Sequence, residues 1–107
     1  MDKLDTAKSA GDVSATIALQ NALKFNGGGH LNHSLFWENL TPAKDSDYKT
    51  DGILHEAIEG SFGSLDEMKK EMSAKTIAVQ GSGWGWLAYN PATGSIEVAT
   101  CPNQDPL

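Results

Sequence analysis

The chain has 107 residues, 39% of them hydrophobic, which is enough to bury the modest core of one ordinary domain. Eight basic residues against 14 acidic ones give a formal charge of -6, and no basic stripe is present, so we expect no nucleic-acid partner. No apolar run approaches the ~20 residues of a membrane span, so we expect no membrane association. The one cysteine, Cys101, has no partner for an internal disulfide, which fits a reducing compartment.

Residues 12–40 carry apolar side chains near the 3.6-residue period and predict helix, with Asp12 as the N-cap. Three glycines, Gly27 to Gly29, interrupt this pattern, and each costs about 1 kcal/mol relative to alanine in a helix interior. Two interpretations stay open. Either the helix breaks at the glycines, or another part of the chain approaches the backbone closely there.

Residues 42–52 are polar and aperiodic, and predict a linker between a helical part, residues 1–41, and a second part, residues 53–107. The second part opens with a short helix that ends near Gly60 or Gly63. Another helix follows it, with a capping box in which Ser64 caps and Glu67 reaches back.

From Thr76 onward the composition favours strands. Residues 76–90 and 95–100 predict two strands, joined by a turn at residues 90–94. Two strands alone make a marginal sheet, so we expect a third strand beyond the C-terminus. The predicted class is α+β: a helical N-terminal part, then short helices and an antiparallel β-sheet that is incomplete in this chain.

His30 and His33 lie three residues apart and therefore on one face of the predicted helix. Imidazole is the commonest metal ligand among side chains, but histidines at this spacing also cap, pair or form hydrogen bonds. His55 has no partner at metal spacing and is predicted to be a surface residue.

Three motifs stand out: Gly-Gly-His-x-Asn-His-x-x-Phe-Trp at residues 28–37, Gln-Gly-Ser-Gly-Trp-Gly-Trp at residues 80–86, and Cys-Pro-Asn-Gln-Asp-Pro at residues 101–106. Together they resemble the iron/manganese superoxide dismutase family, in its manganese type, from about Gly11 to Leu107. The resemblance implies a metal between the two parts of the chain. It also implies an enzyme, an oxidoreductase that disproportionates superoxide to dioxygen and hydrogen peroxide.

The resemblance implies that His33 is a metal ligand and that His30 is a neighbouring hydrogen-bonding or packing residue. It makes Trp84 a wall of the active site, with Trp37 and Trp86 packed around it. Tryptophans otherwise simply fill a core. A dry apolar shell of this kind limits solvent access and tunes the potential of a metal.

Gln104 taken alone lies in a turn sequence. The resemblance implies that its amide hydrogen-bonds the solvent bound to the metal and tunes the reduction potential. Iron-type relatives carry the equivalent glutamine four residues before the helical histidine, where this chain has Gly29. The combination of Gly29 and Gln104 favours manganese as the cofactor, with iron as the alternative. Asp105 follows directly and precedes a proline, so we interpret it as a turn residue and not as a ligand.

Three of the family's four metal ligands have no counterpart here, because the His-His-x-x-Tyr and Asp-x-Trp-Glu-His-Ala-Tyr segments are absent. We therefore expect an internal fragment of the enzyme, lacking both ends and inactive by itself. The alternative is a short non-catalytic protein that binds a partner or holds metal weakly. For the full-length protein the resemblance implies a homodimer or homotetramer in the mitochondrial matrix, with the cytoplasm as the alternative location.

Overall fold

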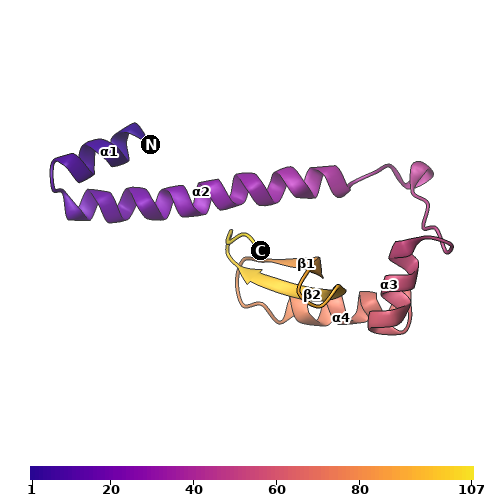
Figure 1. The fold of residues 1–107 in the computed structure, drawn as a ribbon. Helices are drawn as coiled ribbons and strands as arrows, with labels where there is room; N and C mark the ends of the chain where they lie inside the picture. Colours follow the sequence, from indigo (N-terminus) through magenta and orange to yellow (C-terminus); the bar gives the residue numbers. More distant parts are fainter.

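The computed structural model describes residues 1–107 as four α-helices, one 3-10 turn and a two-stranded antiparallel sheet. The predicted α+β class is confirmed. Figure 1 shows a long helical hairpin above a smaller unit, in which one helix runs beneath the two-stranded sheet and another stands at its right-hand end. The elements, in chain order, are α1 (Asp2–Ser9), α2 (Val13–Asn39), η1 (Ala43–Asp45), α3 (Ile53–Phe62), α4 (Leu65–Ile77), β1 (Gly83–Asn90) and β2 (Ser95–Pro102).

Helix α1 packs antiparallel against the first half of α2 and was not anticipated from the sequence (Figure 1). Its eight residues are mostly polar, and only Leu4 and Ala7 are buried. Gly11, with φ of 69°, lets the chain reverse direction between the two helices. The predicted N-cap of α2 is confirmed, because the backbone N–H of Ala15 donates to Asp12 Oδ1 over 3.0 Å.

Helix α2 runs without a break through the three glycines, so the first interpretation of that segment is wrong. The second is confirmed by Gly28 and Gly29. A methyl group on Gly28 would overlap the backbone carbonyl oxygen of Gln104, and one on Gly29 would lie 3.4 Å from the Gln104 side chain. The glycines therefore give the C-terminal tail room to lie directly on the helix.

Helix α3 ends at Phe62, and Gly63 is its C-cap, with a φ of 90° that stops the helix. Gly63 is one of the two end points that the sequence predicted. Ser64 caps α4 as expected, accepting from the Glu67 backbone N–H over 3.1 Å. Glu67 does not reach back to the Ser64 backbone N–H; its carboxylate accepts from Lys70 Nζ over 3.0 Å. This hydrogen bond raises the pKa of the fully exposed Lys70 ammonium.

The predicted strand from Thr76 begins seven residues too early. The Ala78 backbone N–H donates to the Ala74 carbonyl, so residues up to Ile77 complete the last turn of α4. The β-branched residues there favour a strand only weakly, and packing of α4 under the sheet overrides that preference. The second strand reaches Pro102, two residues beyond its predicted end.

The sheet turns its tryptophans away from α4. A methyl group on Gly85 would overlap the Thr76 side chain, so Gly85 faces α4. Successive side chains of a strand point to opposite faces, and Trp84 and Trp86 therefore lie on the face that meets α2. Trp84 is paired with Cys101 in the antiparallel register.

Little of the chain is buried for its size. Eight of the 107 residues are buried, and the accessible surface is 7807 Å², against about 5,800 Å² for a compact monomer of this size. The radius of gyration is 18.7 Å, against about 13 Å for a compact domain. Large apolar side chains such as Trp37 and Ile53 are consequently open to solvent. None of the helices has the length and apolar character to cross a membrane.

Candidate metal centre

His33 lies on α2 with one ring nitrogen occupied and the other free. Its Nδ1 is 2.8 Å from the backbone carbonyl oxygen of Gly29, one turn earlier. A carbonyl oxygen can only accept, so Nδ1 carries a proton, and in the neutral imidazole Nε2 then keeps its lone pair. This hydrogen bond also fixes the ring orientation, as is usual for a histidine that binds a metal.

Trp84 and Gln104 form a hydrogen-bonded pair beside His33. The His33 and Trp84 rings meet edge to face, with centroids 5.0 Å apart. Trp84 Nε1–H donates to Gln104 Oε1 over 3.0 Å. Because an indole N–H can only donate, the amide oxygen of Gln104 must face Trp84, and the two N–H groups of its Nε2 remain without a protein acceptor.

His33 and Gln104 line the same open cavity of ≈ 400 Å³, together with His30 and Gly29. His30 is exposed, and its side chain neither hydrogen-bonds nor stacks on another ring. The sequence motif therefore brings both histidines to one cavity but gives only His33 a fixed orientation. The shared cavity has the chemistry that a small anionic or metal-bound ligand needs: a free imidazole nitrogen and free amide N–H groups.

An aromatic cluster closes one side of this arrangement. Trp86 stacks on Trp84 with an interplanar angle of 15° and centroids 5.4 Å apart. Phe36 meets the edge of Trp84, at 5.8 Å. Trp37 lies beside His33 and Phe36, rather than against Trp84, and is 62% exposed.

The C-terminal tail is held against α2 by a residue that the sequence did not single out. Asn32 is 1% exposed, and its Nδ2 donates to the Gln104 carbonyl oxygen over 3.0 Å. It lies four residues after Gly28, on the face of α2 that carries the tail. A polar residue on the same helical face as a close-approach glycine was the signal that could have identified it.

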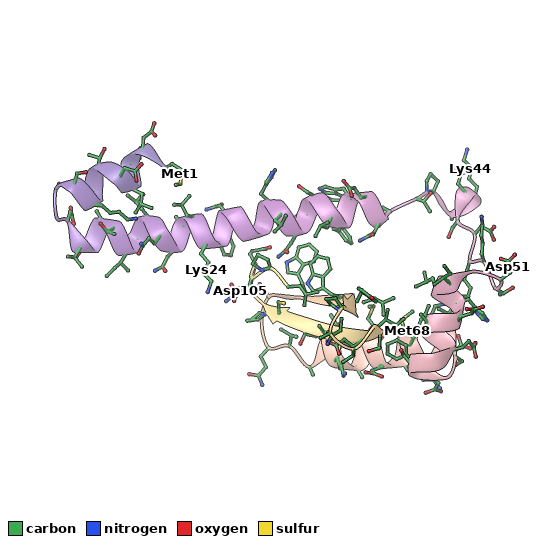
Figure 2. The ribbon with its side chains drawn as sticks, viewed as in Figure 1. Met1, Lys24, Lys44, Asp51, Met68 and Asp105 are labelled. Carbon is green, nitrogen blue, oxygen red and sulfur yellow. The ribbon has the colours of Figure 1, made fainter.

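Lys24 and Asp105 add an ion pair of 3.5 Å on the outside of this contact, where Figure 2 shows the two residues near each other. Asp105 lies in a turn, as predicted, because its backbone N–H donates to the Pro102 carbonyl over 3.1 Å. Lys24 is thus engaged with a carboxylate, and exposed pairs of this kind contribute little to stability.

Comparison with known proteins identifies the family. Residues 1–41 match the model of the iron/manganese superoxide dismutases, alpha-hairpin domain, and residues 50–107 match that of their C-terminal domain. The chain belongs to the iron/manganese superoxide dismutase family. The likeness therefore begins at residue 1, and not at Gly11 as the sequence suggested.

Three members of this family illustrate the similarity. The chain is 54% identical to a mitochondrial manganese superoxide dismutase of Cryptococcus neoformans var. grubii, 55% to one of Petromyzon marinus and 56% to one of Charybdis feriata. The alignments cover 99%, 98% and 99% of this chain, and 48%, 72% and 46% of the relatives. The chain thus spans about half the length of two of these dismutases.

The residues of this superoxide dismutase family member fit one ligand position of a metal centre and not a complete centre. No group of three or more histidine, cysteine, aspartate or glutamate side chains is close enough together to hold an ion. One imidazole with a free Nε2, flanked by an oriented amide, makes one corner of such a centre. The remaining donors of a metal site would have to come from outside residues 1–107.

His55, predicted to be a surface residue, is partly exposed and has partners that the sequence did not indicate. It is half-buried, its Nδ1 lies 3.0 Å from the Tyr48 hydroxyl, and its Nε2 lies 3.8 Å from Glu59 Oε1. The contact was missed because Tyr48 belongs to the irregular segment before α3, for which the sequence predicted no fixed conformation. His55 lies on α3, apart from the cavity lined by His33 and Gln104.

Proposed function

We propose that this chain is part of a manganese superoxide dismutase, which converts superoxide to dioxygen and hydrogen peroxide. In this proposal the chain contributes the metal ligand His33 and the hydrogen-bonding amide of Gln104. The observation that carries it is the contact of Gln104 with both Trp84 and Gly29 at the cavity that His33 lines. The names of the three relatives support the same activity.

Gln104 acts through its free N–H groups. Trp84 holds the amide oxygen, so the nitrogen can donate to an oxygen atom of a ligand in the cavity without first reorienting. Manganese, when bound, would supply the one-electron oxidation and reduction that side chains cannot perform. A fixed neutral donor beside it would tune its potential, and the tryptophans would limit the access of water.

The pair of Gly29 and Gln104 favours manganese over iron as the cofactor. A methyl group on Gly29 would already touch Oε1 and Cδ of Gln104 at 3.4 Å. A glutamine at position 29 would therefore compete with Gln104 for the same space. Only one of the two positions can supply the amide, and this chain supplies it from the C-terminal tail, as the manganese type does.

We further propose a homodimer or homotetramer of the full-length protein in the mitochondrial matrix, with residues 1–41 and 53–107 as two domains joined by residues 42–52. The relatives' names support the location. The open apolar side chains of α2 support burial of this helix in a larger assembly. A short non-catalytic protein is not favoured, because models of both family domains match.

The test compares the chain alone with a longer protein that carries it together with the family's other ligand segments. We expect the longer protein to purify with stoichiometric manganese and to dismutate superoxide far faster than free manganese. The chain alone should do neither. A longer protein that holds no manganese, or dismutates no faster than the free ion, would show that the proposed function is wrong.

A further inference from the structure

Asn103, the residue before Gln104, is the only residue other than glycine with a positive φ, at 51°. Such a backbone is uncommon for residues with a Cβ atom, and asparagine is among the side chains that tolerate it best. The Asp105 N–H donates to the Pro102 carbonyl, so Asn103 and Gln104 are the two central residues of a β-turn. A positive φ at the first central position of a turn is the conformation that glycine adopts most readily.

This turn is fixed on both sides of the Asn103–Gln104 peptide. The Asn103 N–H donates to the Ser82 carbonyl over 2.7 Å, on the side of the sheet. The Gln104 carbonyl accepts from Asn32 Nδ2 over 3.0 Å, on the side of α2. With both ends held, the direction in which the Gln104 side chain leaves the backbone depends on the backbone angles of Asn103.

The Asn103 side chain itself is exposed, and it forms no hydrogen bond or ion pair. Judged by its contacts alone, its replacement by alanine should be neutral. Judged by its backbone, the replacement should be unfavourable, because alanine lacks the tolerance of asparagine for a positive φ. One expectation is no effect and the other is an unfavourable effect, so an experiment can separate them.

We propose that Asn103 is a positioning residue for Gln104. Its left-handed backbone aims the Gln104 amide at Trp84 and at the cavity that His33 lines. The catalytic consequence rests on the proposed dismutase function, whereas the positioning itself does not. An adverse φ at this position should shift the equilibrium from the observed turn to relaxed turns by about 5- to 30-fold.

The experiment uses the full-length protein with Asn103→Gly and Asn103→Ala, which differ from each other by one methyl group. The first readout is the indole ¹H–¹⁵N resonance of Trp84 in the metal-free protein, assigned by its loss in Trp84→Phe. The second is the pH profile of dismutation by the manganese-loaded protein. Gln104→Ala provides the reference for an amide that is absent.

We expect Asn103→Gly to keep the wild-type indole resonance and pH profile. Asn103→Ala should move both toward those of Gln104→Ala. An indole resonance that stays at the wild-type position in Asn103→Ala would overturn the proposal. So would an equal change in the glycine variant, because the side chain and not the backbone would then be responsible.

Two further outcomes are informative. If Asn103→Ala does not fold, Asn103→Asp replaces it, since aspartate also tolerates a positive φ, and a shifted indole resonance in that variant would overturn the proposal. If the resonance moves in Asn103→Ala while dismutation is unchanged, Asn103 positions Gln104 as proposed, and the role of Gln104 in the proposed function is wrong.

Discussion

The indole N–H of Trp84 donates to the side-chain oxygen of Gln104, and this hydrogen bond decides which end of the amide faces the cavity. Trp84 comes from β1 and Gln104 from the tail after β2, on a sheet face turned toward His33. The pair thus converts an amide that could lie either way round into a donor of fixed direction.

Replacing Trp84 by phenylalanine should therefore lower the rate of dismutation strongly and the free energy of unfolding only slightly. The aromatic packing is largely kept, and the lost hydrogen bond costs about 1 kcal/mol. Dismutation by the full-length protein should fall by about 10-fold or more, since Gln104 is then free to turn. Trp86→Phe is the matched control: Trp86 Nε1 is buried without a partner in this chain, so no hydrogen bond is lost. Equal loss of rate in both variants would contradict the prediction.

Gly28→Ala should destabilise the protein although alanine favours helix. Its methyl group would overlap the Gln104 carbonyl oxygen, and overpacking of this kind costs about 1–3 kcal/mol. Gly27→Ala has nothing within 4 Å of the added methyl and should be stabilised by about 1 kcal/mol from helix propensity alone. Denaturant unfolding of the two variants measures the difference. Stabilisation of Gly28→Ala to the same extent would mean that the tail does not lie on the helix.

His33→Ala in the full-length protein should abolish retention of manganese, because the imidazole with the free Nε2 is removed. His30→Ala should keep the metal, since the His30 side chain lines the cavity without a fixed orientation. Metal analysis of the purified variants provides the measurement. Retention of manganese by His33→Ala would refute the ligand assignment, whatever the activity.

Asn32→Ala should lower the free energy of unfolding by about 1–3 kcal/mol, because the carbonyl oxygen of Gln104 loses its donor in a part-buried contact. Ser34→Ala offers a control on the same helix, since the Ser34 hydroxyl donates only to the His30 carbonyl of its own helix and is exposed. A destabilisation of Asn32→Ala no larger than that of the control would show that the Asn32 contact carries no weight.

The sequence correctly predicted the features that depend on interactions between residues close together in the chain. The caps at Asp12 and Ser64 and the stop at Gly63 follow from side-chain and backbone preferences that act within a few residues, and all three are present. Strand propensity at Thr76 failed because packing of α4 against the sheet competes with it.

The candidate site was harder to derive. The family resemblance placed His33 and Gln104 at one metal site. Periodicity and spacing alone did not, because the cavity that the two residues share depends on contacts across the fold. The role of Asn32 was missed for the same reason, since its partner is 72 residues away in the chain. Helix α1 was missed because a short, largely polar segment has no periodic apolar pattern to detect.

The 72-residue separation between Asn32 and Gln104 also has a kinetic consequence. Helices such as α2 and hairpins such as β1–β2 form from neighbours in sequence within microseconds, whereas this contact must close a long loop first. The last step of folding is therefore expected to be the arrival of the tail on the three glycines. During folding the His33 imidazole would be present on α2 well before the Gln104 amide reaches it. The order of folding therefore delays completion of the site until both parts of the chain are formed.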